Sequence, residues 1–104
     1  MKLYTTDTIE GEKIEKSLGL VQGAVVQSKH VGRDIMAGLK TIVGGEIKGY
    51  TEMLQNARSI ATERMIEEAK KIDADAIVGV RFGSSTLMAG SAEIIAYGTA
   101  VKLK

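Results

Sequence analysis

The fold is decided by the stretch Ile42-Val43-Gly44-Gly45-Glu46-Ile47-Lys48-Gly49-Tyr50, which leads into a long segment of helical spacing. Over residues 47–72, apolar side chains recur at intervals of three and four, and charged side chains occupy the positions between them. This pattern predicts a long amphipathic helix. Residues 31–43 show the same spacing and predict a short helix, which the pair Gly44-Gly45 would end because a positive φ is favoured there.

The remaining segments predict strands. Val-rich and Ile-rich stretches indicate strands at residues 2–6, 18–29, 76–82 and 92–103. Gly19 and Gly23 indicate bulges or a close approach of another backbone to the second strand. Residues 7–17 are polar and are expected to form a turn, with one helical turn at residues 13–17.

The apolar pattern of the last two strands bears on assembly. Ile77-Val78 and Ile94-Ile95 are consecutive apolar residues, a pattern typical of strands buried on both faces. One long helix can cover one face of a four-stranded sheet, and little chain is left for the other face. A neighbouring subunit is the expected cover.

Composition limits the possible functions. The chain has 104 residues, which predicts a single domain over residues 1–104. Its 14 basic and 13 acidic residues give a net charge of +1, too balanced to attract nucleic acid or an anionic membrane. The absence of Cys excludes disulfide and thiolate chemistry and is consistent with a cytoplasmic location. The first residues lack an apolar signal-peptide core, and no apolar run approaches the ~20 residues of a membrane span.

Several short motifs in order along the chain carry a family resemblance. They are Thr5-Thr6, Leu18-Gly19-Leu20-Val21-Gln22-Gly23, Arg33-Asp34, Ile42-Val43-Gly44-Gly45, Ala74-Asp75-Ala76 and Gly98-Thr99-Ala100-Val101. With them the sequence resembles, from end to end, the YbjQ family of small uncharacterised proteins, which are often labelled heavy-metal-binding. The resemblance implies an α+β subunit like that of dodecin, with a small, mainly antiparallel sheet of about four strands on one long and one short helix. It also implies a ring, as a homopentamer or a decamer, with no cofactor and no established activity.

One position departs from the pattern of the resembled family. That family usually has Gly before the Ala-Asp-Ala motif, where this chain has Asp73. Asp tolerates the left-handed conformation better than most residues, so the long helix is still expected to end there.

Metal ligands are few. Soft heavy metals prefer thiolate and imidazole, and this chain offers no Cys and only His30. His30 is a weak candidate ligand, since copies of it could meet on the axis of a ring. Asp73 and Asp75 are spaced like the start of a calcium loop, but a strand without further acids follows, which favours a turn.

No catalytic pattern stands out. Residues 44–51 resemble a P-loop but have Tyr50 where the phosphate-binding Lys belongs. Ser28, His30 and Asp34 include the residue types of a catalytic triad, but no nucleophile elbow accompanies them. The first hypothesis is therefore an oligomeric binding or scaffold protein with a small-ligand site between subunits. The second is a metal-ion binder, and the third is an enzyme.

Four residues are the candidates for a ligand site. They flank the two ends of the expected short helix and are Arg33, Asp34, Glu46 and Tyr50. Glu93, in the last strand, is expected to face either solvent or the channel of a ring.

Overall fold

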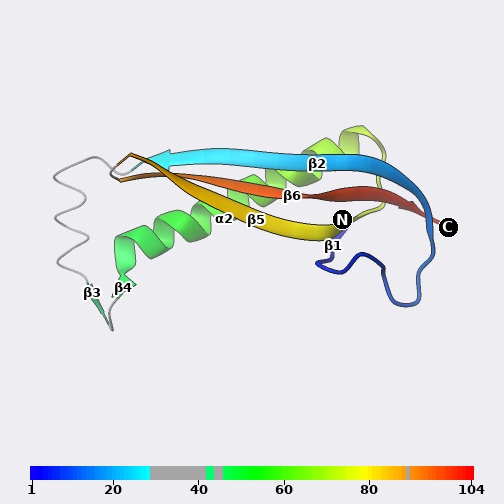
Figure 1. The fold of residues 1–104 in the computed structure, drawn as a ribbon, viewed down its shortest axis with the longest axis horizontal. Coiled ribbons are helices and arrows are strands. Elements are labelled where there is room, and N and C mark those ends of the chain that lie inside the picture. The colour runs from blue at the N-terminus through cyan, green and yellow to red at the C-terminus, as the bar shows by residue number, and fades with distance from the viewer. Residues whose placement is uncertain (29–41, 44–45, 89) are drawn as a thin grey trace.

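The computed structural model describes residues 1–28, 42–43, 46–88 and 90–104. They form a four-stranded sheet with one long helix along one of its faces (Figure 1). The sheet strands are β1 (Lys2–Leu3), β2 (Ile14–Ser28), β5 (Ala76–Met88) and β6 (Ser91–Leu103). A separate two-stranded sheet, β3 (Ile42–Val43) with β4 (Glu46–Ile47), precedes the helix α2 (Lys48–Lys71).

The order of strands in the large sheet is β1-β5-β6-β2. β5, β6 and β2 are antiparallel neighbours, whereas β1 runs parallel to β5, so the sheet is mixed. Two residues beyond β1 continue its contact with β5. The Tyr4 N–H donates to the Ile77 carbonyl and the Val80 N–H donates to the Tyr4 carbonyl, both at 2.9 Å.

The long helix was predicted correctly within a residue at each end. Its buried face is built from four residues spaced by four, Ala57, Ala61, Met65 and Ala69, each fully buried. Three of them are Ala, and their small side chains let α2 come close to the sheet. The helix backbone comes close to β2 at Gly23, where an added Cβ would overlap the backbone of Ala61 and Met65. Gly19 has a φ of +110° and lies at a register shift of β2, so both glycines play the parts expected of them.

Three sequence predictions about strands were wrong. β5 continues to Met88, whereas the strand was expected to end at residue 82. β2 begins at Ile14, so residues 14–17 are strand rather than turn or helix, because the end of β6 supplies pairing partners for them. Ile42–Val43 is a strand paired with Glu46–Ile47, not the end of a helix. Two β-branched residues before Gly-Gly are typical of a hairpin. The rest of the expected short helix, residues 31–41, and its break at residues 44–45 lie outside the described residues.

The two faces of the large sheet differ in cover. The face under α2 holds the main core, with Val21, Val25, Ile77, Val80 and Ile94 buried against the helix. The opposite face is called here the outer face, and the described residues cover it at one end only. There residues 4–14 fold over, and Ile9 packs on Ala76, Val78 and Val101.

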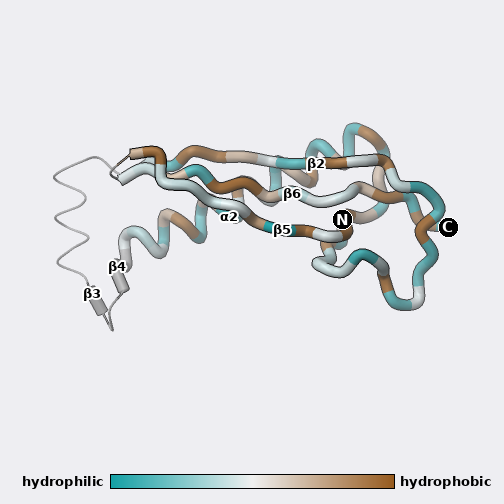
Figure 2. The backbone as a smooth tube through the Cα atoms, in the orientation of Figure 1, coloured by the Kyte–Doolittle hydropathy of each residue, from teal (hydrophilic) through white to brown (hydrophobic). Residues whose placement is uncertain are grey.

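Within the part of the chain that the structure describes, the rest of the outer face is open. Leu20 is 68% exposed, Val26 56% and Tyr97 40%, although all three lie in strands. Figure 2 shows hydrophobic colour along the latter half of β2, where this open part lies. The expectation of an uncovered second face therefore holds for this half of the sheet and was wrong for the half under the N-terminal segment. In the described part of the chain, no helix has the length and apolar character to cross a membrane.

Candidate functional site

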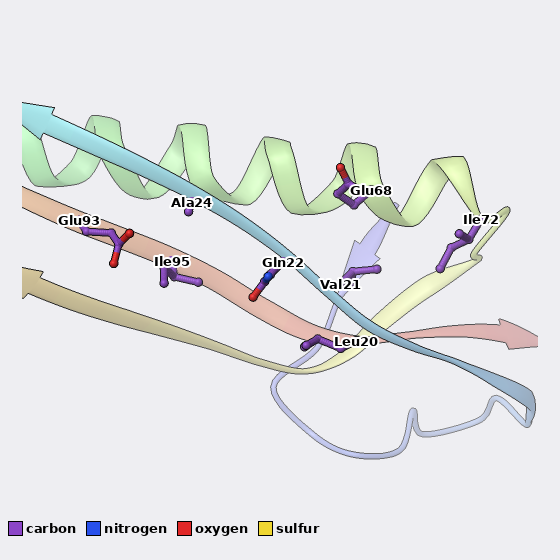
Figure 3. A pocket seen from close by; sticks show the side chains of 8 residues that line it. All are labelled: Leu20, Val21, Gln22, Ala24, Glu68, Ile72, Glu93 and Ile95. Atoms are coloured by element: carbon purple, nitrogen blue, oxygen red, sulfur yellow. The ribbon is translucent and has the colours of Figure 1, made fainter.

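A groove follows the edge of β2 and is called here the β2 groove. Its volume is about 660 Å³, and its lining comes from three elements and the turn after α2: Leu20, Val21, Gln22, Ala24, Glu68, Ile72, Glu93 and Ile95. Figure 3 shows Glu68 and Ile72 on the helix side of β2, and Gln22, Glu93 and Ile95 on the other side. The groove thus includes surface from both faces of the sheet.

The β2 groove combines apolar surface with negative charge. Leu20 and Ile72 are exposed large apolar side chains at its wall. Among the described residues, its charged lining consists of two carboxylates, Glu68 and Glu93. Glu68 makes an exposed ion pair with Lys71 at 3.4 Å, which contributes little to stability. Among the described lining residues, no nucleophile is paired with a base.

Arg64 modifies the same edge. Its Nη1 donates a 2.7 Å hydrogen bond to the Ala24 carbonyl of β2. An edge strand presents unpaired carbonyls and N–H groups to solvent, and a charged side chain on one of them limits unwanted pairing. The Arg64 side chain therefore occupies the edge of β2 at Ala24.

A second hollow lies between the start of α2 and the end of the β5–β6 hairpin, and is called here the Tyr50 pocket. Its volume is about 410 Å³, and it is lined by Tyr50, Met53, Leu54, Ser84, Ser85, Thr86, Gly90, Ser91 and Ala92. Five of these side chains carry a hydroxyl, which can donate or accept a hydrogen bond. Ser91 is buried, and its hydroxyl bonds Ser28 at 3.2 Å. The pocket offers a polar wall and an apolar wall to a small molecule.

The predicted site residues are only partly placed. Tyr50 lines the Tyr50 pocket. Glu46 lies in β4, opposite Val43. His30, Arg33 and Asp34 lie outside the described residues. The hydroxyl residues of the pocket were not foreseen, and the run Ser84-Ser85-Thr86 in a strand was the available signal.

Asp73 and Asp75 form a structural turn, as the sequence favoured. Asp73 ends α2 in the left-handed conformation, with φ +59°. Asp75 accepts the Leu103 N–H at 2.8 Å, and Lys102 Nζ lies 3.3 Å from Asp75 and 3.4 Å from Asp73. The Leu103 N–H holds the pKa of Asp75 below its usual value, and Lys102 adds to this. The hydrogen bond to Asp75 raises the pKa of Lys102. Across the described ranges, no three His, Asp or Glu side chains are grouped so as to hold a metal ion.

Comparison with known proteins identifies the family. The YbjQ family model, described as "Putative heavy-metal-binding", matches residues 1–104. The chain belongs to this family. A YbjQ relative from Thermotoga maritima, named a UPF0145 protein, is 60% identical over 104 residues, which are 100% of this chain and 98% of the relative. Another from Vibrio parahaemolyticus is 64% identical over 99 residues, covering 95% of this chain and 94% of the relative.

A solved structure supports the fold of this YbjQ chain. A Pediococcus pentosaceus protein, described as having unknown function and belonging to the DUF74 family, superposes with a TM-score of 0.68. The superposition covers 100% of this chain and 98% of the other at 15% sequence identity. At that identity the likeness concerns the fold alone.

Proposed function

We propose that this YbjQ chain is the subunit of a self-assembling binding or scaffold protein, in which neighbouring copies cover the open part of the outer face. The observation that carries the proposal is the exposure of Leu20 and Val26 of β2 and of Tyr97 of β6 on the outer face. Contiguous exposed apolar surface marks an interaction site. Burying a fully exposed Leu or Val side chain contributes about 1.5–3 kcal/mol, and Leu20 and Val26 would contribute less than this because each is already partly buried.

A ring of the dodecin kind, a homopentamer or a decamer, is the form of assembly that we propose. A closed ring buries the same surfaces on every copy and leaves none unsatisfied. Nucleic acid and membranes are not partners in this proposal, because the net charge of +1 offers no field to attract them. A cytoplasmic location is part of the same proposal and is consistent with the absence of Cys.

The Tyr50 pocket is the proposed site for a small ligand. Its hydroxyl groups would bind a small polar molecule, and Met53 and Leu54 would contact its apolar part. Subunit boundaries are common places for such sites. The candidates Arg33, Asp34 and Glu46 stay in the proposal as ligand-site residues on their sequence alone. The proposal requires no cofactor and no catalytic step.

Metal-ion binding is the second candidate, and it rests on the description printed for the family. The described residues offer no cluster of ligands for it. The candidate ligand His30 lies outside them, and one imidazole per chain needs symmetry to form a site. The self-assembling scaffold is therefore the function that the structure supports better.

The scaffold is tested by placing a charge on the outer face. Val26→Lys should shift the protein toward smaller species in sedimentation velocity, because an ammonium group is costly to bury. Glu67→Lys, on the exposed side of α2, is the matched control and should sediment like the wild type. Unchanged assembly of Val26→Lys would rule out the outer face as the contact surface.

A further inference from the structure

The large sheet has two free edges on opposite sides. Along β2, no described strand pairs with the side that faces away from β6. Along β5, β1 pairs only with Ala76 and Ile77, and the hydrogen bonds of Tyr4 and Thr6 end at Val80. Within the described residues, 82–88 of β5 therefore pair with β6 alone. Free edges are templates for pairing with another chain.

We propose that these two edges form one interface, in which the free edge of β5 in one copy pairs with β2 of the next copy. The sheet then continues from subunit to subunit. The inference rests on the proposed self-assembly and adds to the contact proposed on the outer face a second contact, along the edges of the sheet. The partner is a second copy of this chain.

The backbone groups on the two edges suit this pairing. The Val80 N–H points away from β6, because it donates to Tyr4. Residues of a strand alternate in the side to which their N–H and C=O point, so the groups of Phe82, Ser84 and Thr86 lie on the same free edge. On β2, the Ala24 carbonyl also points outward, where it accepts the Arg64 hydrogen bond that pairing with a neighbour's strand would replace. By the same alternation, Gln22 and Val26 also present their groups outward.

The placement of the helix gives the two edges different shapes. α2 lies over β2, as the close approach at Gly23 shows. At the opposite edge of the sheet, Phe82 of β5 lies on the same face as the helix and is 51% exposed. It lines a hollow with helix residues Arg58, Thr62 and Glu63 that nothing in the described structure fills. A neighbour that docks through its β2 would bring its own helix over this hollow and cover Phe82.

Strand direction makes the contact directional. β2 and β5 are both antiparallel to β6, so they run parallel to each other. A rotation about an axis along the strands keeps that direction, so β5 would meet the neighbour's β2 as a parallel pair. Because the contact joins two different edges, each copy can bind a further copy in the same way. Such a contact closes into a ring when the rotation that relates neighbouring copies is a whole fraction of 360°.

Cysteine cross-linking tests the pairing directly, because the chain has no Cys of its own. Ser85→Cys on β5 is mixed, after co-refolding, with each of Gln22→Cys, Ala24→Cys and Val26→Cys on β2. All four positions lie on the outer face. We expect a disulfide-linked dimer in at least one mixture and little in any variant alone. Cross-links only between two β2 positions, or none in an assembled protein, would overturn the proposal.

A proline at the free edge gives a second test. Ser84→Pro removes an N–H from the outward edge of β5 and leaves the pairing with β6 intact. We expect light scattering to show smaller species for Ser84→Pro at unchanged far-UV circular dichroism, and wild-type assembly for Ser84→Ala. Intact assembly of Ser84→Pro would count against the interface. A wild type that is itself monomeric would instead refute the proposed self-assembly.

Discussion

At the scale of single residues, Gly23 shows how one missing side chain sets the helix position. A Cβ there would overlap the backbone of Ala61 and Met65, which cannot move as a flexible side chain could. Gly23→Ala should therefore lower the free energy of unfolding by about 1–3 kcal/mol, the usual cost of overpacking. Urea unfolding measures it. Gly83→Ala is the control, since a Cβ there meets nothing within 4 Å and should leave stability nearly unchanged.

Asp75 makes a second residue-scale prediction, about pH. Its pKa is lowered in the folded state, chiefly by the Leu103 N–H, so it binds protons less readily than in the unfolded chain. Its contribution to stability is fully present above the usual Asp value of 3.8 and is lost as pH falls through the lowered pKa. Urea midpoints of the wild type and Asp75→Asn should differ at neutral pH and converge in strong acid.

A midpoint difference between these two proteins that stays constant from neutral pH into strong acid would contradict the role of the Asp75 carboxylate.

Lys102 gives the matching test at high pH. Its pKa is raised above the ordinary Lys value of 10.5. Its contribution is present below that value and is lost as pH rises through the raised pKa.

At the scale of elements, the end of α2 depends on a conformation that few residues adopt. Asp73 has a φ of +59°. A β-branched residue is strained there by roughly 1–2 kcal/mol, so Asp73→Val should lower the thermal midpoint by several degrees. Asp73→Asn keeps a short polar side chain and serves as the control. Equal midpoints for the two variants would show that the helix ends in some other way.

The elements also show what the sequence could predict. α2 could be predicted almost to the residue because its apolar spacing runs through six turns. The start of β2 at Ile14 could not, because residues 14–17 are strand only through pairing with the distant end of β6. The hairpin of β3 and β4 was missed because Ile42 and Val43 also fit the helical spacing before them. In both segments the secondary structure depends on pairing with another strand, and the local sequence pattern does not predict that pairing.

The candidate site could be predicted less well than the fold. Tyr50 was identified from its place beside the Gly-rich segment, and it lines a pocket. The pocket's other hydroxyl residues come from β5 and β6, and only the tertiary fold brings them to α2. The β2 groove likewise joins residues from β2, β6 and the end of α2 that no sequence motif connects.

At the scale of the whole molecule, the family description raises the question of metal. We predict no tight, stoichiometric binding of zinc or cadmium at neutral pH, because a tetrahedral site needs about four thiolate or imidazole donors. The chain has no Cys and one His. Calorimetric titration of wild type and His30→Ala is the measurement. Submicromolar binding at one site per subunit would defeat the prediction, and one site per assembly that is lost in His30→Ala would identify a symmetric His30 site.

The central claim is that this chain assembles with other copies of itself. Light scattering on the wild-type gel-filtration peak tests it most directly. The account predicts a mass several times that of the 11.1 kDa chain, held on dilution to micromolar concentration. A single species of one chain mass at that concentration would contradict it.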